Sequence, residues 1–347
     1  MRTTREGDLS AAALFFLKAY GLARRPTSAI DGPLAYFLQQ LANALAPASI
    51  YALLAAGYAL IYGITGRINL AFGDFTTVGA MAAVNGIVLG SAGHAMLLVW
   101  GVPAGLALAA VAGTALGAAL HALVFGPLRR SSSQALLIAT IGLAIAISEG
   151  LRLATGSRQT WLPPLLDRPV TLLTLPDGSV SSSLAQTLLA LLALATIAVV
   201  LAILGRTDFG RRYRACADDL EAAALVGIDV ERVLRLACML GGAVAGIAGF
   251  VVAVRYGIVA FAMGTLWGFK ALAAAIVGGI GSLPGAVLGG AMIGLLEGLW
   301  SGYLPSTYRE VALFALLALT LAVRPHGLFG TTPASQNPSL ERRFFRF

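Results

Sequence analysis

Three charged side chains interrupt long apolar stretches of the sequence, and their chemistry is suited to holding a charged solute. Asp74 ends a short polar break, Lys270 stands at the start of an apolar stretch, and Glu297 lies inside another. A buried carboxylate can hold an ammonium group, and a buried ammonium can hold a carboxylate. Because a charge is costly in an apolar environment, each of these groups needs a partner or a water-filled cavity.

The break that contains Asn69, Phe72, Gly73 and Asp74 is the predicted part of a solute path. A polar, glycine-containing break exposes backbone groups that must face protein or a water-filled cavity. Broken helices also direct N-terminal amides toward carboxylates and C-terminal carbonyls toward ammonium groups. For Asp74 the alternative to ligand contact is capping of the following helix, and Asn69 has the same two interpretations.

Lys270 has three interpretations, of which the pattern favours the first. Its ammonium reaches the membrane interface along a flexible stem, or contacts a solute carboxylate, or forms an ion pair across the bundle. Glu297 is more interior to its segment, so we expect it to have a structural partner.

The densest charge cluster runs from Arg206 to Val233, and we call it the polar segment. Six acidic residues and five arginines lie in this segment, and long apolar stretches flank it on both sides. Such a segment cannot lie in hydrocarbon, so it is predicted to be a water-exposed loop between two spans. From Tyr213 onward it is typical of a helix, with apolar residues at helical spacing: Leu220, Ala224, Leu225 and Ile228. A helix with one apolar face is suited to docking on a partner, and the alternative is a solvated loop helix without one.

Other chemistries have little support in the sequence. Lys18 and Lys270 do not follow a glycine, so the phosphate-binding motif G-x-x-x-x-G-K-[ST] does not occur. Cys216 and Cys238 suggest no disulfide framework, and no acid pair, catalytic triad or metal-ligand spacing is visible. We therefore expect no enzyme activity and no cofactor in this chain. Gly285 and Gly289 have the spacing of close helix packing.

The composition indicates a polytopic membrane protein. Of the 347 residues, 58% are hydrophobic and 12% are charged, whereas soluble domains have about 25% charged residues. The formal net charge is +8. Because the arginines lie in loops and tails, contact with membrane lipid explains this charge better than contact with nucleic acid.

The apolar stretches predict an all-α membrane bundle of about eight spans with broken or re-entrant segments. The spans are expected at 37–64, 96–125, 135–153, 184–204, 234–254, 266–280, 286–300 and 311–323. The stretch 75–90 is short and broken by glycine, so it is predicted to re-enter the membrane or to form a half-helix. The loop 161–182 is expected to lie outside.

Arginine placement predicts which parts face the cytoplasm. Arginines gather near positions 24–25 and 129–130, in the polar segment and in the tail, so all four regions are expected to be cytoplasmic. The predicted organisation is a cytoplasmic extension (1–32), a membrane domain (33–330) and a cytoplasmic tail (331–347). The number of crossings between the first two arginine pairs must then be even, so 75–90 is the expected exception; if it does cross fully, the N-terminus would be outside, against its arginines.

Several stretches resemble a known family. The polar segment contains G-R-R-Y-R-A-C-A-D-D-L-E-A-A-A-L-V-G-I-D, with Glu221-Ala222-Ala223 followed after three residues by Gly227. The stretches I-N-L-A-F-G-D-F, F-K-A-L-A-A-A-I-V-G-G-I-G-S-L-P-G-A and R-P-H-G-L-F-G are also similar to that family. From about Leu38 to Gly330 the chain resembles the permeases of branched-chain amino acid ABC transporters. Phe72 and Asp74 replace the usual His and Glu, and the I-x-L-P continuation of the E-A-A motif is absent.

The resemblance implies an inner-membrane permease subunit that works by alternating access. It implies a second related permease, two ATPase subunits that bind the ATP, and a periplasmic binding protein. Coupling to the ATPases would involve Asp218, Glu221, Ala222, Ala223 and Gly227. The substrate would be a branched-chain amino acid or a related solute such as another amino acid, urea or an amide. The alternative function is an ion-coupled secondary transporter or channel, for which Asp74 and Glu297 are the supporting acids.

Overall fold

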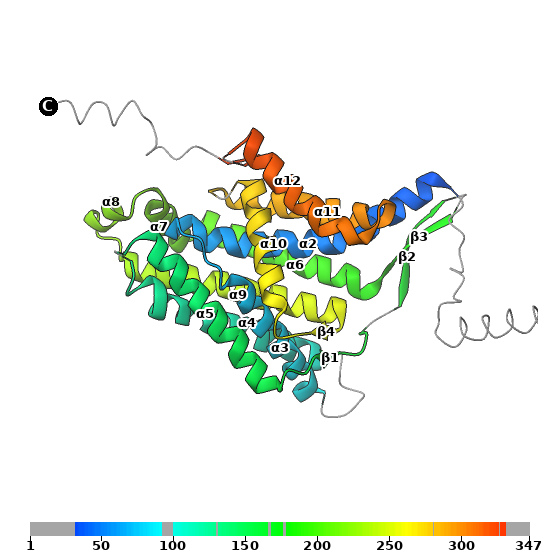
Figure 1. Ribbon diagram of the computed structural model, residues 1–347, viewed down its shortest axis with the longest axis horizontal. Coiled ribbons are helices and arrows are strands. Elements are labelled where there is room, and N and C mark those ends of the chain that lie inside the picture. Colours follow the sequence, from blue (N-terminus) through cyan, green and yellow to red (C-terminus); the bar gives the residue numbers. More distant parts are fainter. Residues whose placement is uncertain are drawn as a thin grey trace, which may run out of the picture.

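The protein is a bundle of long helices. The computed structural model describes residues 32–91, 100–129, 131–165, 168–175, 178–279, 281–325 and 327–330. Eight helical segments in these ranges are long and apolar enough to cross a membrane. This confirms the predicted all-α membrane bundle and its approximate number of spans (Figure 1).

The helices follow one another along the chain, and the longest connection, between α5 and α6, contains three strands. In order they are α2 (Pro33–Thr65), α3 (Phe72–Gly90), α4 (Val102–Leu120), the π-helix η3 (His121–Phe125), α5 (Ser133–Thr155), α6 (Leu184–Arg206), α7 (Asp208–Asp218), α8 (Leu220–Leu225), α9 (Val230–Tyr256), α10 (Met263–Gly278), α11 (Leu283–Tyr303), the 3-10 helix η4 (Ser306–Tyr308) and α12 (Arg309–Val323).

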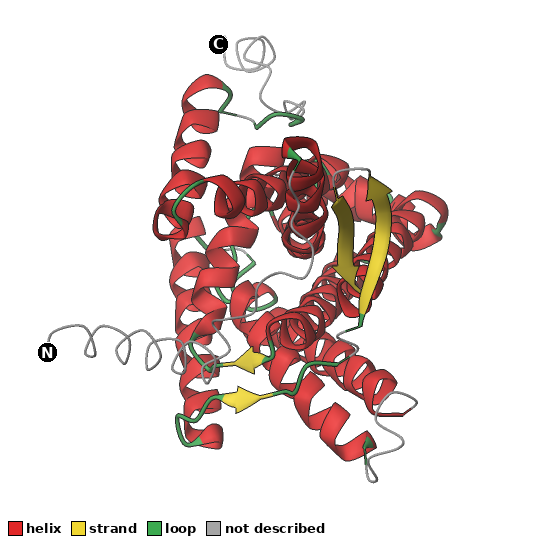
Figure 2. Ribbon diagram, turned by 90° about the vertical axis from the view of Figure 1, so that its right-hand side faces the viewer, coloured by secondary structure: helices red, strands yellow, loops and turns green. Residues whose placement is uncertain are grey.

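Two small antiparallel strand pairs complete the described structure. Strand β1 (Thr160–Trp161) pairs with β4 (Ile258–Val259), and β2 (Pro169–Leu175) pairs with β3 (Gly178–Ser183). Figure 2 shows both pairs separate from each other on an otherwise helical molecule. Three of the four strands belong to the part of the chain that was predicted to be an external loop.

The polar segment and the β2–β3 hairpin lie at opposite ends of the bundle. Helix α2 has 33 residues and is therefore about 50 Å long. Near its C-terminal end, the Leu60 carbonyl accepts a hydrogen bond of 2.8 Å from the Tyr213 hydroxyl of the polar segment. Near its N-terminal end, the Gln39 amide exchanges hydrogen bonds with the Ser181 backbone of β3. Figure 1 shows α7 and α8 at the left and the hairpin at the right.

The described chain begins and ends at opposite ends of the bundle. Arg129 pairs with Glu231 beside the polar segment, and Gly330 lies against Gly279, close to the start of α11. Pro33, where α2 begins, lies at the hairpin end. The start of α2 therefore lies at the other end from the polar segment, which is the arrangement expected if 75–90 crosses fully. The N-terminal extension itself, residues 1–31, lies outside the described residues.

The short helix of the bundle is not the one that was predicted. Helix α3 has 19 residues and is long and apolar enough to cross a membrane, whereas the stretch 75–90 was expected to re-enter the membrane or to form a half-helix. The predicted stretch started at residue 75, whereas the helix already begins at Phe72. Instead α10, which was expected to cross as 266–280, has only 16 residues. In Figure 1 α10 runs across the direction of α2.

Helix α3 begins inside the bundle rather than at its surface. The Asn69 backbone N–H donates a hydrogen bond of 3.2 Å to the Tyr58 hydroxyl. Tyr58 precedes the end of α2 by seven residues, which is about 10 Å along that helix. After α2 the chain therefore turns back into the interior before α3 starts. The predicted break is present between α2 and α3, but it covers 66–71, because Phe72, Gly73 and Asp74 already belong to α3.

Small residues allow the helices to pack closely. On α11, one face carries glycines four residues apart that lie against alanines of α2: Gly290 on Ala52, Gly294 on Ala48 and Gly298 on Ala44. A Cβ atom on any of these glycines would collide with α2. Gly289 likewise lies against Gly278 of α10, which confirms the close packing predicted from the glycine spacing.

Candidate functional site

Asp74 is a buried carboxylate without a bonding partner. It lies in the first turn of α3 and is 2% exposed. Its Oδ1 atom accepts no hydrogen bond, and none of the ion pairs among the described residues includes it. No side chain caps α3, whose N-cap residue is Ala71. The capping interpretation of Asp74 therefore has no hydrogen bond to support it, and the charge is left for another group.

A cavity of about 310 Å³ lies beside this carboxylate. It is enclosed by the break before α3, by α5 and by α10. Its walls are mostly apolar, and they are formed with Asp74 by Leu70, Ile141, Ala144, Ile145, Thr265, Gly268 and Phe269. The cavity thus combines one carboxylate with several aliphatic and aromatic surfaces.

Glycines set the position of Asp74 against α10. A Cβ atom on Gly73 would collide with the Gly264 carbonyl and the Gly268 backbone, so α3 and α10 touch at this point. A Cβ atom on Gly264 would lie 2.5 Å from Asp74 Oδ1. The carboxylate consequently lies against the first turn of α10, whose N-terminus also has no side-chain cap. Two helix N-termini face Asp74, and their dipoles favour its ionised form.

Asn69 and Phe72 shape the break without lining the cavity. The Asn69 Oδ1 atom accepts a hydrogen bond of 3.1 Å from the Ala71 backbone, while its buried Nδ2 atom has no partner. Phe72 is fully buried and meets the Tyr58 ring edge-on, with ring centroids 5.4 Å apart. Both side chains therefore hold the turn that brings Asp74 into the interior.

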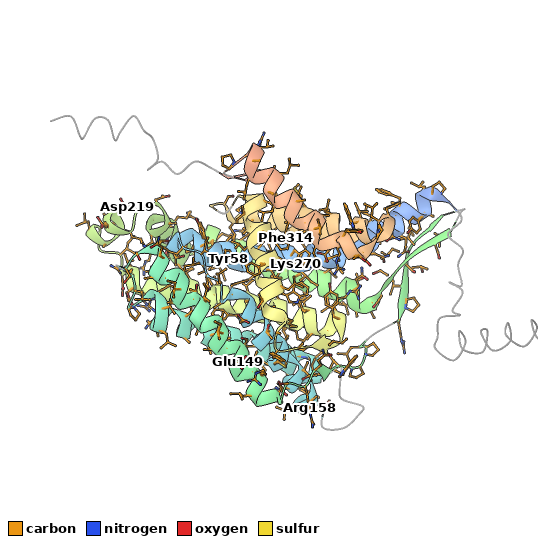
Figure 3. The ribbon with its side chains drawn as sticks, in the orientation of Figure 1. Tyr58, Glu149, Arg158, Asp219, Lys270 and Phe314 are labelled. Carbon is orange, nitrogen blue, oxygen red and sulfur yellow. The ribbon has the colours of Figure 1, made fainter. Side chains whose placement is uncertain are left out.

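Lys270 lies in a separate buried cluster. Its Nζ atom is 2.9 Å from the Tyr51 hydroxyl, 3.2 Å from Glu297 Oε2 and 2.8 Å from Glu310 Oε1. Trp267 adds a ring 5.9 Å from the same atom. Lys270 is 3% exposed, and Figure 3 places it in the middle of the molecule. Its ammonium is fully engaged by protein groups.

This cluster joins four helices and is balanced in charge. Arg309 lies 3.3 Å from Glu297 and 3.5 Å from Glu310, so two cations face two anions across α10, α11 and α12, and Tyr51 adds α2. Of the three interpretations of Lys270, the ion pair across the bundle is the one observed. The favoured one, in which the lysine reaches the interface, is wrong. Sequence reasoning did not find Tyr51, Arg309 or Glu310, because their pairing spans helices far apart in the chain.

The polar segment forms two short helices rather than one. The Thr207 side chain caps α7, and the Asp219 carboxylate caps α8 by accepting hydrogen bonds from the Glu221 and Ala222 backbone at 2.8 and 3.0 Å. Asp219 also ends α7 in an extended conformation, so the helix predicted from Tyr213 onward is interrupted there. Figure 3 places Asp219 at the outer tip of the molecule.

The predicted coupling residues lie in α8 or close to its ends. Glu221, Ala222 and Gly227 are exposed, whereas Ala223 is buried against the bundle. Gly227 has φ +85°, a conformation that favours glycine, and it reverses the chain between α8 and α9. Asp218 lines a cavity of about 470 Å³ between α7 and the start of α11. Among the described side chains, the tip also presents two large apolar residues to solvent, Leu225 and Val226, which are 88% and 77% exposed.

Helix α7 is anchored by one buried face. The Tyr213 hydroxyl bonds to α2, and Cys216 lies against the same core. Burial raises the pKa of the Tyr213 phenol and of the Cys216 thiol above their ordinary values. Both groups therefore stay neutral at physiological pH. The neutral inner face and the charged outer face of α7 give this helix one side for the bundle and one for water.

Taken together, a bundle of candidate membrane spans, a cavity with one unpartnered carboxylate and an exposed helical tip are the features expected of a membrane transport protein. Residues 40–323 match the family model described as branched-chain amino acid transport system / permease component. The chain belongs to this family, and it is a transporter permease rather than an enzyme.

Two kinds of curated relatives illustrate the similarity. The chain is 35% identical over 298 residues to the high-affinity branched-chain amino acid transport system permease protein LivH of Salmonella typhimurium and to LivH of Escherichia coli K12. It is 33% identical over 299 residues to BraD of Pseudomonas aeruginosa. Each alignment covers 85% of this chain and 96% of the relative. No solved structure matches the chain significantly.

Proposed function

We propose that this chain is the membrane subunit of an ATP-driven importer that moves branched-chain amino acids through the inner membrane. The observation that carries the proposal is the similarity to LivH and BraD over 85% of the chain, together with the family match. This similarity favours branched-chain amino acids over the other solutes considered, which are other amino acids, urea and amides. Alternating access at the permease would move the solute.

The orientation follows from the positions of the arginines. The polar segment, Arg129 and the chain after Val323 share one end of the bundle, so this end faces the cytoplasm. The hairpin β2–β3, the β1–β4 pair and the start of α2 then face the outside, where a periplasmic binding protein delivers the solute. The C-terminal tail is cytoplasmic in this arrangement, and α2 enters the membrane from the outside.

ATP is bound by partners, and the polar segment receives their movement. Two ATPase subunits dock on the cytoplasmic tips, one on this chain and one on a second related permease. The exposed Glu221, Ala222, Leu225 and Val226 form the contact, and Gly227 sets the direction in which α8 points. Docking drives transport only if the ATPase binds one conformation of the bundle better than the other.

A second permease completes the path. Helices α5 and α12 are the least buried of the candidate spans. Their apolar outer faces meet either lipid or the second permease, and no nucleic acid is involved. The cavity beside Asp74 includes residues of α5, so the wall of this cavity belongs to the peripheral face of the bundle.

An ion-coupled secondary transporter is the alternative. It requires membrane-embedded acids that are free to take up an ion or a proton. Glu297 is paired with Lys270 and Arg309, which leaves Asp74 as the supporting acid among the described spans. The family match favours the ATP-driven importer.

The two functions are separated by one uptake experiment. Cells that contain the permease pair, the ATPases and the binding protein are given radiolabelled leucine, with either intact ATPases or ATPases lacking their catalytic residue. We expect uptake with the intact ATPases alone. Uptake that persists with inactive ATPases and stops when the ion gradient collapses would support the alternative. A thermal-shift screen of the binding protein against leucine, isoleucine, valine, urea and acetamide identifies the solute.

A further inference from the structure

We propose that the cavity beside Asp74 is a binding site within the membrane for the ammonium group and apolar side chain of the transported amino acid. The inference rests on the proposed function, because it assigns a site to the solute of that function. Four features of the structure carry it: the unpartnered carboxylate, its charge state, the apolar walls and the place of the cavity in the bundle.

The carboxylate of Asp74 needs a positively charged partner. It is 2% exposed, its Oδ1 atom has no hydrogen bond, and it faces a cavity rather than solid protein. A buried charge without a partner is strongly unfavourable, and neutral replacements would be more stable. We therefore expect a positively charged group that enters the cavity to pair with Asp74.

The neighbouring helix N-termini favour a negative charge on this group. Asp74 lies in the first turn of α3 and against the first turn of α10, and no side chain caps either helix. The positive ends of the two helix dipoles stabilise an anion at this place. The cavity therefore presents a negative charge to an entering solute, which selects a cation.

The remaining walls indicate which kind of cation fits. Calcium needs six to eight oxygen ligands and magnesium six, whereas this cavity offers one carboxylate among aliphatic and aromatic side chains. The described ranges contain no group of three or more His, Cys, Asp or Glu side chains placed to hold a metal ion. An organic ammonium that carries an apolar group satisfies both parts of the site. Leu70, Ile141, Ile145 and Phe269 supply surfaces for a branched aliphatic side chain.

Size and position agree with this assignment. The volume of about 310 Å³ is at the lower end of the range for small-molecule sites, about 300–1,000 Å³. Ile141 and Ile145 on α5 are 38% and 58% exposed, so the cavity adjoins the outer face of the bundle. The opposite wall is the crossing of α3 and α10, where the first turns of the two helices touch. A change in the packing of α5 against this crossing would open or close the site.

The test measures solute binding to the permease itself. The assembled complex of permease pair and ATPases is purified without the binding protein, and binding of tritiated leucine is followed by scintillation proximity. We expect 3-methylbutylamine, which keeps the ammonium and the side chain, to displace leucine. We expect 4-methylpentanoate, which lacks the ammonium, to displace it at least about 30-fold less well, the ratio for losing one close charge pair.

Variants locate the site. Asp74→Asn should weaken leucine binding by about 30-fold or more, and Asp74→Glu should restore most of it. Ala144→Phe should fill the cavity and abolish binding. The matched controls are Glu149→Gln, which removes an exposed carboxylate, and Ile138→Phe, which adds the same ring to the outward face of α5. Both controls should bind leucine as the unchanged protein does.

The outcomes separate this inference from the proposed function. Equal displacement by the amine and the acid, or unchanged binding in Asp74→Asn, would overturn the site while leaving ATP-driven uptake in place. A complex that shows leucine uptake with its binding protein but no leucine binding without it would also overturn the site. Absence of leucine uptake in the complete system would instead contradict the proposed substrate. Size-exclusion profiles show whether each variant remains folded.

Discussion

Replacing Lys270 by methionine should destabilise the bundle by a predictable amount. The Lys270 ammonium lies 3.2 Å from Glu297 and 2.8 Å from Glu310, and it is 3% exposed. At an effective dielectric constant of about 20, two unit charges 3.2 Å apart attract by about 5 kcal/mol. Most of this gain is offset by the loss of hydration when the charges are buried. The measurable quantity is therefore the effect of removing one partner.

Removal leaves an excess negative charge among buried groups. Breaking a buried pair from one side costs about 3–5 kcal/mol. Arg309 still lies 3.3 Å from Glu297 and is partly exposed, so we expect the lower end, about 3 kcal/mol. For 347 residues the entropy of unfolding is about 0.7 kcal/mol per kelvin, and the melting temperature should fall by about 4 °C.

The assay compares single and double variants in detergent. Melting is followed by fluorescence-detected size exclusion for Lys270→Met, Glu297→Gln and the two together. The double variant retains one cation and one anion, Arg309 and Glu310, so it should recover most of the lost stability. Glu149→Gln, at an exposed pair, should change the melting temperature little.

Two results would refute this reasoning. A melting temperature of Lys270→Met equal to that of the unchanged protein would mean that the cluster is hydrated and contributes little. A double variant less stable than either single variant would mean that the two residues act independently.

Three further predictions concern packing and the polar segment. Gly73→Val should prevent α3 from reaching Gly264 and abolish the monodisperse protein peak, whereas Gly142→Val, which meets no neighbour, should not. Gly227→Val should strain a backbone with φ +85° by about 1–2 kcal/mol and reduce co-purified ATPase; undiminished association would contradict the docking role. Burial raises the pKa of the Cys216 thiol, so its thiolate fraction is lower in the folded than in the unfolded protein at neutral pH. Maleimide labelling of the folded protein at pH 7 should therefore be slower and should rise as the pH increases; equal rates would argue against burial.

The approximate number of spans follows from the sequence, but the boundaries of two helices do not. Hydropathy identifies apolar runs of sufficient length, and charge clusters separate them. At the break before α3, polar Asp74 was assigned to the interruption although it lies in the first turn of the helix. The three residues from Phe72 to Asp74 decided whether the helix was long enough to cross. The stretch from Leu266 to Gly278 is equally apolar. Its composition therefore does not reveal that α10 is short and runs across α2.

The direction of α2 was mistaken for a related reason. The even number of crossings before Arg129 required one apolar stretch to be discounted, and α3 was the one chosen. Once α3 is a full-length helix, the described chain starts and ends on different sides. Arg129 and the polar segment lie at the same end of the bundle, as the arginine placement predicted, and the number of helices between them and Pro33 places the start of α2 at the other end.

The candidate site was partly visible in the sequence. Asp74 could be found because a single acid in an apolar segment needs a partner or a functional role. Lys270 and Glu297 were found separately, but their mutual contact could not be found, because they are 27 positions apart on different helices. Tyr51 and Glu310 gave no signal, since a tyrosine or an acid near a helix end is ordinary. The cavity also depends on α5, which contributes only common aliphatic residues.

The contact of α11 with α2 has a consequence for how this protein can change over evolution. Gly290, Gly294 and Gly298 leave no space for even a methyl group against the facing alanines. Along that line, tolerated replacements should be few and confined to the smallest residues. The exposed face of α11, which carries Leu288 and Met292, does not pack against α2, so one bulky aliphatic residue there can replace another more freely. Related sequences should therefore diverge in stripes, with invariant lines every fourth position beside highly variable ones.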